Sequence, residues 1–337
     1  MRDGSLVERA AGAAPAERLA SLDSLRGAAI LAVLCSHFLG AVGLGRGFDD
    51  AVVDLGRGGV TLFFLLSGYL IFRNVQVQPA STFLWRRFFK VMPAYWLNIA
   101  VILVADLLDA GAAHFPARSY LACFFAMSDL LGVQAVSGVF WTLLIEIKFY
   151  AFIAIQYRVL GRRHLHAVLA ALLLLELAFR ADRGHGSLTL AYFPVFYLGI
   201  EISLAEAAGW HPRAMRRLAA VALLLAGSLY LCLDQHRLGA AGYLLASAAV
   251  FVVALRGRLS NRLAGFMGLT SYSNYLYHSI VAGVVFAWLG TGRGPVASLA
   301  VLAAALLAAT AAATALYRLV EVPMVGLGRR LTTRRAR

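Results

Sequence analysis

The sequence predicts an all-α membrane protein, a polytopic bundle of about ten transmembrane helices with both termini in the cytoplasm. Of its 337 residues, 61% are hydrophobic and 14% are charged, which is outside the usual balance of a soluble globular domain. The apolar residues come in long runs, such as 167–178, 218–233 and 296–316, that approach the length needed to cross a bilayer. Alternating ten-residue strands are absent, which argues against an outer-membrane barrel.

Hydropathy places the spans in order along the chain. They are predicted at residues 25–45, 59–77, 93–111, 139–157, 165–181, 187–206, 217–233, 240–255, 264–290 and 296–318.

A shorter apolar stretch, residues 119–134, is interrupted by Asp129 and Gly132. Counting it as a span would place every later loop on the opposite side of the membrane. We therefore predict that it forms a re-entrant or interfacial helix on the outer side.

The net charge of +14 is explained by where the cations fall rather than by nucleic-acid binding. Lysine and arginine crowd into one set of alternate loops and both tails, and the other loops are sparse. The positive-inside rule therefore puts both termini in the cytoplasm. We expect a multi-pass protein of the bacterial cytoplasmic membrane. The sparse loops carry only Arg46, Arg57, Arg118, Arg180, Arg183, Arg237 and Arg293.

The domain organisation follows from the same pattern. We expect a flexible cytoplasmic tail over residues 1–20 without a cleavable signal peptide, a membrane domain over 21–323 and a basic cytoplasmic tail over 324–337. No metal site is predicted, because the three cysteines fall in apolar segments where a thiol behaves as a small hydrophobe. They are Cys35, Cys123 and Cys232.

The first span carries the most informative pair of polar residues. His37 follows Arg26 by eleven residues, which is roughly 16 Å along a helix and about half the thickness of the hydrocarbon core. If Arg26 lies at one membrane surface, His37 lies near the midplane. An ionisable group at that depth predicts a functional site facing the protein interior.

The second span has Ser67 and Gly68 halfway along it, followed by Tyr69. Glycine allows another chain to approach closely, so helix packing is the favoured interpretation of the Ser67-Gly68 pair taken alone. Contact with a ligand is the alternative.

The fourth span contains two opposite charges, Glu146 and Lys148, on roughly opposite faces of a helix. They therefore cannot neutralise each other. Glu146 shares a face with Thr142 and Tyr150, and a carboxylate within a span favours a functional role. Pairing with an arginine or tyrosine of a neighbouring helix, as a structural contact, is the alternative.

The ninth span contains His278 near its centre, at a predicted depth that matches His37. Ser67 and Glu146 are expected at the same depth in their own spans. The tyrosines beside His278 could bond to it, so a hydrogen-bonded core residue and a functional residue remain equal interpretations. Glu176 and Glu201, nearer the ends of their spans, are expected to be structural or interfacial.

A basic cluster formed by Arg86, Arg87 and Lys90 directly precedes the predicted third span. Such a cluster is usually a topology signal. Clustered guanidinium and ammonium groups also suit the phosphates of a nucleotide-like donor, and anionic lipid headgroups are the competing partner.

In their order along the chain, these elements resemble the acyltransferase-3 family of integral membrane O-acyltransferases, over about residues 22–323. The matching motifs are Leu22-Asp23-Ser24-Leu25-Arg26-Gly27 with His37; Phe63-Phe64 through Ser67-Gly68-Tyr69; Arg86-Arg87-Phe88-Phe89-Lys90 with Pro93 and Tyr95; Trp141-Thr142-Leu143 with Glu146 and Phe149-Tyr150; Ser271-Tyr272 with Tyr275-Leu276 and His278; and Tyr317-Arg318 with Glu321 and Pro323.

The resemblance implies transfer of an acyl group, expected to be acetyl, from cytoplasmic acyl-CoA to a hydroxyl of a carbohydrate or glycosylated product. It implies no permanently bound cofactor, because acyl-CoA is a co-substrate, and it makes Arg26 and His37 the central pair. The family often has a second arginine where this chain has Lys90, and lysine keeps the charge but loses the bidentate fork. We expect the donor to contact Arg86, Arg87, Lys90, Ser67, Gly68 and Tyr69, and the acceptor to contact Trp141, Tyr150, Tyr275 and His278.

The chemistry of the residues agrees with this assignment. A histidine of near-neutral pKa can take the proton of a hydroxyl as it attacks a thioester, so His37 is the predicted general base, with a transient acyl-histidine as the variant mechanism. Glu146 would orient the imidazole. A proton-linked transporter or flippase for an anionic or glycan substrate is the main alternative, although no internal repeat supports it.

Overall fold

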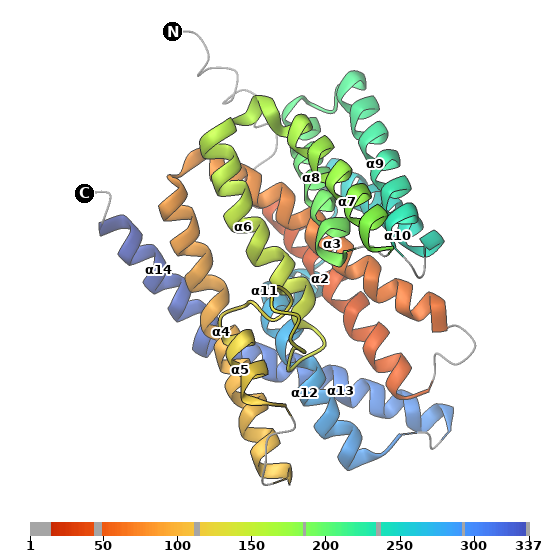
Figure 1. The fold of residues 1–337 in the computed structure, drawn as a ribbon. Helices are drawn as coiled ribbons and strands as arrows, with labels where there is room; N and C mark the ends of the chain where they lie inside the picture. The colour runs from red at the N-terminus through yellow and green to blue at the C-terminus, as the bar shows by residue number, and fades with distance from the viewer. Residues whose placement is uncertain are drawn as a thin grey trace. The chain divides into compact units, whose positions relative to one another are not determined.

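The computed structural model describes residues 15–43, 49–110, 115–184, 187–233, 237–291 and 294–334 (Figure 1). These residues form helices and irregular segments, with no strand among them. Within this part of the chain, eight helical stretches are long and apolar enough to cross a membrane. The predicted all-α, multi-span class is therefore confirmed.

Two of the predicted spans, 139–157 and 264–290, are not among those eight stretches. Both become helices, but each contains polar or charged side chains that lower its mean hydropathy, including Glu146 in the first and His278 in the second. The count of about ten spans and the cytoplasmic position of the termini remain predictions.

The chain divides into two compact units. Unit 1 comprises residues 1–77 and 159–271, and unit 2 comprises residues 78–158 and 272–337. The helices of unit 1 are α2 (Pro15–Ala41), α3 (Asp49–Val77), η1 (Arg162–His164), α7 (Leu165–Arg183), α8 (Leu188–Ala207), α9 (Pro212–Cys232), α10 (Arg237–Arg256) and α11 (Arg262–Leu269). Those of unit 2 are α4 (Ala80–Ala110), α5 (Ala117–Phe124), α6 (Phe140–Leu160), α12 (Ser271–Leu289), α13 (Pro295–Leu316), η2 (Tyr317–Glu321) and α14 (Val322–Arg334).

Two predicted span boundaries are wrong in an informative way. The third span was expected to begin at residue 93, but α4 begins at Ala80 and carries Pro93 inside it. The basic cluster therefore lies within a helix rather than ahead of one. The ninth span, predicted over 264–290, is broken at Thr270 between α11 and α12.

The predicted tails are partly helical. Helix α2 begins at Pro15, and residues 1–14 lie outside the described part of the chain. At the other end, α13 passes through the π-helix η2 into α14, which continues to Arg334. Residues 335–337, Arg46 and Arg293 also lie outside the described residues.

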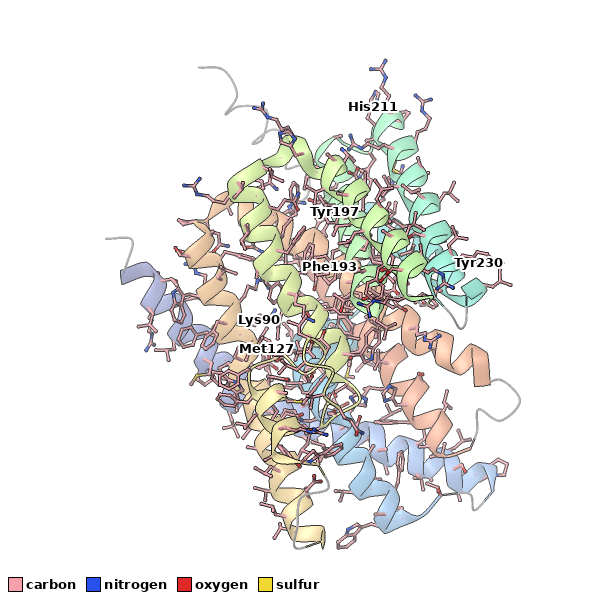
Figure 2. The ribbon with its side chains drawn as sticks, in the orientation of Figure 1. Lys90, Met127, Phe193, Tyr197, His211 and Tyr230 are labelled. Atoms are coloured by element: carbon pink, nitrogen blue, oxygen red, sulfur yellow. The ribbon has the colours of Figure 1, made fainter. Side chains whose placement is uncertain are left out.

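Unit 1 is held together by close approach of helix backbones at glycines. A Cβ atom at Gly68 of α3 would lie 2.0 Å from the carbonyl oxygen of Phe196 in α8, and one at Gly199 of α8 would lie 2.1 Å from that of Leu65. Small residues permit this approach, so the packing interpretation of Gly68 is confirmed. Phe193 and Tyr197, one turn apart on α8 (Figure 2), are buried in the same region.

The contacts between α2 and α3 give the relative depth of their residues. Gly56 lies against Ser36, and Gly59 lies against the backbone of Ala29, so the two helices are antiparallel. Ser67 follows Gly56 by eleven residues, or roughly 16 Å along α3, toward the Arg26 end of α2. The prediction that Ser67 shares the depth of His37 is therefore wrong.

In unit 2, α4 and α12 run parallel and are joined by hydrogen bonds. The Tyr272 hydroxyl donates to the carbonyl of Val91 at 2.7 Å, and the Asn98 side chain donates to that of Leu276 at 2.9 Å. A third such bond runs from the Tyr277 hydroxyl to the carbonyl of Ala94 at 3.0 Å.

Helix α6 runs antiparallel to α4 and begins beside its middle. The rings of Tyr95 and Phe140 are 4.8 Å apart, and those of Phe83 and Tyr150 are 6.3 Å apart. Because Tyr95 lies halfway along α4, the first residue of α6 lies beside the middle of that helix. The sequence had placed it near the outer surface.

The segment between α4 and α6 folds back along α4, in agreement with the predicted re-entrant segment. Near the end of α4, Asp106 accepts a hydrogen bond from Tyr120 of α5. Deeper, the Tyr95 hydroxyl donates to the carbonyl of Cys123 at 2.8 Å, and Trp96 Nε1 donates to that of Phe124 at 2.9 Å. The chain thus descends roughly 15 Å along α4 between these contacts.

Candidate active site

In unit 1, the segment Asp23–Gly27 packs against α11. Ser24 Oγ accepts from the backbone N–H of Asn261 at 3.0 Å, and a Cβ at Gly27 would lie 1.8 Å from the carbonyl oxygen of Ala264. These contacts give Ser24 and Gly27 structural roles. Arg26 pairs with Asp23 at 2.8 Å, and both side chains are partly exposed.

His37 lies on the same helix, eleven residues beyond Arg26. Its side chain is exposed, whereas the sequence predicts one that faces the protein interior. Arg26 and His37 remain roughly 16 Å apart along the helix, so they do not contact each other.

Tyr69 belongs to a polar cluster that sequence reasoning missed. Its buried hydroxyl donates to the carboxylate of Glu206 and accepts from Arg73 Nη1 at 2.6 Å, and Arg73 also pairs with Glu206. The one-turn spacing of Tyr69 and Arg73 could have predicted their mutual contact, but not the contact of either with Glu206. Backbone packing against α8 accounts for Gly68, and hydrogen bonds to the Arg73–Glu206 ion pair account for Tyr69. Neither residue needs a ligand to explain it.

In unit 2, Arg87 lies between two aromatic rings. Its guanidinium carbon is 5.4 Å from the ring centroid of Phe83 and 5.4 Å from that of Tyr150. The Tyr150 hydroxyl donates to Glu146 Oε1 at 2.6 Å. The predicted polar stripe on α6 is confirmed for these two residues, and its partner on α4 is an arginine of the basic cluster.

The same arginine and tyrosine border a pocket of about 490 Å³ between α4 and α6. Its wall is mostly apolar, with Arg87 supplying the positive charge, which is the composition expected of a site for a ligand with an apolar arm and an anionic end. The pocket is lined by Ser81, Leu84, Trp85, Arg87, Phe88, Val91, Met92, Ile147, Tyr150 and Ala151.

The other two cations of the cluster have protein partners. Arg86 Nε donates to Thr332 Oγ1 of α14 at 3.0 Å, and its Nη1 donates to Gln78 at 3.3 Å. Lys90 interacts electrostatically with Glu321, a buried carboxylate at the end of the π-helix that also accepts from Ser273. The three cations therefore differ in their surroundings: Arg87 borders the pocket, whereas Arg86 and Lys90 contact other parts of unit 2.

Tyr275 of α12 reaches the beginning of α6. Its hydroxyl donates to the carbonyl of Val139 at 3.0 Å and is hydrogen-bonded to Thr142. Trp141, also predicted to bind substrate, lies between Val139 and Thr142 and is half-buried. The structure therefore brings Trp141 and Tyr275 into one region, and Tyr150 lies about two turns further along α6.

His278 is almost fully buried and its hydrogen bonds define its ring orientation. Nδ1 faces the carbonyls of Asn274 at 3.1 Å and Tyr275 at 2.9 Å, and Nε2 lies 3.2 Å from Ser279 Oγ. Because carbonyls only accept, Nδ1 carries a proton in this arrangement. Two of its partners are backbone carbonyls and one is a serine, and its ring lies 6.2 Å from that of Tyr275.

The polar groups of unit 2 lie at successive positions along the helix axes rather than at one common depth. Tyr150 lies beside Arg87, Tyr275 lies beside the start of α6, and His278 lies on the helix that bonds to Asn98. Glu146 is six residues from Phe140, so it lies roughly 9 Å below the level of Tyr95. The predicted common depth of Glu146 and His278 is wrong. We call the series Arg87, Tyr150, Glu146, Thr142, Tyr275 and His278 the polar track.

Lys148, on the opposite face of α6 from Glu146, pairs with Asp129 of the re-entrant segment. The prediction that Glu146 and Lys148 do not pair is confirmed. Asp129 was noted in the sequence only because it interrupts an apolar run. An acidic residue in such a run was the signal that could have identified it as the partner of Lys148.

His37 and Ser67 belong to unit 1, whereas Glu146 and His278 belong to unit 2. The predicted pairing of Glu146 with the His37 imidazole therefore remains a prediction. Glu146 is instead hydrogen-bonded within its own helix, to Tyr150.

Comparison with known proteins identifies three relatives. Nodulation protein 10 of Rhizobium leguminosarum bv. viciae is 31% identical over 153 residues, covering 39% of this chain and 42% of that protein. The exopolysaccharide production protein ExoZ of Rhizobium meliloti (strain 1021) is 27% identical over 300 residues, covering 82% of this chain and 91% of that protein. The peptidoglycan O-acetyltransferase OatA of Listeria monocytogenes serovar 1/2a is 29% identical over 150 residues, covering 39% and 22%.

The chain spans less than half the length of nodulation protein 10 and of OatA, but most of the length of ExoZ. No solved structure is significantly similar to it. The family model described as an acyltransferase domain matches residues 19–318, which include both units and every motif considered above except the end of the last one. On this match, the chain belongs to the acyltransferase-3 family of integral membrane acyltransferases.

Proposed function

We propose that this protein is a multi-pass O-acyltransferase of the bacterial cytoplasmic membrane, and that it transfers an acetyl group from cytoplasmic acetyl-CoA to a hydroxyl of a carbohydrate or glycosylated product. Family membership supports acyl transfer. The names of two relatives, which mention exopolysaccharide production and peptidoglycan O-acetylation, support a carbohydrate acceptor.

The observation that carries the donor assignment is the pocket bordered by Arg87 and Tyr150. It lies along the amino-terminal half of α4, the end that the loop charges predict to be cytoplasmic. A guanidinium presents several N–H donors to phosphate oxygens, and the apolar wall suits the pantetheine arm. Arg86 and Lys90 then support the site indirectly, by joining α4 to α14 and to Glu321.

The proposed reaction is a direct transfer with His37 as general base. The acceptor oxygen attacks the thioester carbonyl carbon as His37 takes the hydroxyl proton; the C–O bond forms, the C–S bond breaks, and the thiolate receives the proton. Arg26 holds the anionic donor near the cytoplasmic surface. A transient acyl-imidazole on His37 remains the variant mechanism.

The test uses purified protein in lipid nanodiscs, with acetyl-CoA labelled in the acetyl group and a pool of sugar acceptors. We expect label on a sugar hydroxyl with the wild type and none above background with His37→Ala. The matched control is His164→Ala, which removes an exposed histidine from η1 and should keep wild-type activity. Full activity of His37→Ala would contradict the assignment of the base.

The same preparation separates this proposal from a transporter. Sealed vesicles that move a glycan across the bilayer without acylating it would support transport. Label trapped on His37 after a rapid acid quench, without acceptor, would favour the acyl-histidine variant over direct transfer.

A further inference from the structure

The re-entrant segment of unit 2 has an unusual backbone for its depth. Residues 125–139, between α5 and α6, form turns, bends and irregular stretches rather than a helix. Phe124, the residue just before it, accepts a hydrogen bond from Trp96, which is halfway along α4 and roughly 21 Å from the end of that helix. This irregular chain therefore lies well inside the predicted hydrocarbon layer.

Irregular backbone at such a depth is tolerated only where protein covers it or where it borders a water-filled cavity, because lipid cannot satisfy its N–H and C=O groups. Several residues of the segment are exposed, and they include the polar side chains of Asp129 and Gln134 and the backbone of Gly132 and Gly138. Polar side chains and irregular backbone are costly to place in lipid, so their exposure favours water beside the segment.

The ion pair of Asp129 with Lys148 points the same way. The two side chains are 33% and 21% exposed. Charged groups within a membrane face the bundle interior or a water-filled cavity, because burial in lipid costs several kcal/mol. A partly exposed ion pair between α6 and the re-entrant segment therefore indicates that water reaches it.

Aromatic rings lie at the start of the same segment. Trp96 stacks on Phe124 with ring centroids 5.0 Å apart and planes at 11°, and Phe124 and Phe125 are both exposed. Flat rings next to hydrogen-bonding charges suit a sugar, whose C–H face packs on a ring while its hydroxyls bond to carboxylate and ammonium groups.

We propose that residues 125–139 line a water-filled vestibule in which a carbohydrate acceptor binds, with Asp129 accepting hydrogen bonds from its hydroxyls and Lys148 donating to its oxygens. By the loop charges, the vestibule opens to the side opposite the termini. Its inner end is Val139, whose carbonyl accepts from Tyr275, so the vestibule leads to the polar track. The sugar specificity rests on the proposed function; the hydrated vestibule does not.

Accessibility of engineered cysteines tests the vestibule without any enzymatic assay. In a background where Cys35, Cys123 and Cys232 are alanine, Leu130→Cys is compared with Leu97→Cys, an exposed position on the regular helix α4 beside Trp96. A negatively charged methanethiosulfonate reagent is applied to intact cells and to inverted vesicles. We expect labelling at position 130 at least about tenfold faster than at 97, and faster from the cell exterior. Equal rates at the two positions would overturn the vestibule.

The acceptor role is tested with p-nitrophenyl β-D-glucopyranoside as the sugar probe. Asp129→Asn and Lys148→Gln should each raise the KM for the sugar about tenfold and leave the KM for acetyl-CoA and its sugar-independent hydrolysis unchanged. The exchanged pair Asp129→Lys with Lys148→Asp should recover the protein yield but not the sugar KM. Recovery of the sugar KM, or loss of donor hydrolysis, would show that the pair is only structural.

The two assays fail separately. Rapid labelling of position 130 in a protein that transfers no acetyl group would retain the vestibule and refute the proposed function. Acetyl transfer by a protein whose position 130 is labelled as slowly as position 97 would retain the proposed function and refute the vestibule.

Discussion

The guanidinium of Arg87 lies over the ring of Tyr150, 5.4 Å from its centroid, and connects the basic cluster of α4 to the polar stripe of α6. Cation–π contact holds the guanidinium in place without using its N–H groups. Arg87 also lines the pocket, whereas Arg86 bonds to α14, and for this reason the proposed phosphate contact is assigned to Arg87.

We therefore expect adjacent arginines to differ. Arg87→Ala should raise the KM for acetyl-CoA about tenfold or more, because a charge-assisted contact is lost. Arg86→Ala should leave that KM within about twofold and lower the thermal midpoint, because its guanidinium bonds to Thr332 and Gln78. Steady-state kinetics and thermal unfolding in detergent measure the two effects. Equal increases in the donor KM would contradict the distinction.

Glu146→Gln should reduce the rate of acetyl transfer by at least about tenfold if the carboxylate positions Tyr150, since an amide is a weaker acceptor for the phenol. Tyr150→Phe should show a similar loss if the same contact is responsible. The matched control is Asp182→Asn, which neutralises an exposed carboxylate of α7 and should keep full activity. A wild-type rate for Glu146→Gln would reduce the residue to a packing role.

Gly68→Ala should destabilise the protein by about 1–3 kcal/mol or prevent its recovery, because the new Cβ would lie 2.0 Å from the carbonyl oxygen of Phe196. Gly227→Ala is the control, since no atom lies within 4 Å of a Cβ there. It should be neutral or stabilise helix α9 by about 0.5–1 kcal/mol. Fluorescence-detected size-exclusion after heating measures both. Unchanged stability of Gly68→Ala would show that α3 and α8 can move apart.

Tyr69→Phe tests the ion-pair cluster at the end of α3. Loss of the hydroxyl removes its hydrogen bonds to Glu206 and Arg73, so we expect a loss of about 1.5–3 kcal/mol in stability. The KM for acetyl-CoA should remain unchanged if the residue is structural. A normal thermal midpoint with a raised donor KM would instead support the donor contact that the sequence predicts.

The sequence predicts the order of the helices well because each apolar run is a local property of the chain. It also predicts which α6 residues share a face, since Thr142, Glu146 and Tyr150 recur at helical spacing. It does not predict that α6 begins beside Tyr95, because the depth of a helix depends on its neighbours. The assumption that a polar residue at mid-span lies at mid-bilayer therefore failed for Ser67 and Glu146.

By itself, the sequence determined that this is a multi-span helical acyltransferase, since hydropathy, loop charge and the order of the motifs are all linear features. Only the tertiary structure decided which residues of each motif are free to act. It assigned Gly27 and Gly68 to backbone packing, Arg86 to α14 and Arg87 to the pocket. Neighbouring residues of like chemistry acquire different roles because a helix turns successive side chains toward different partners.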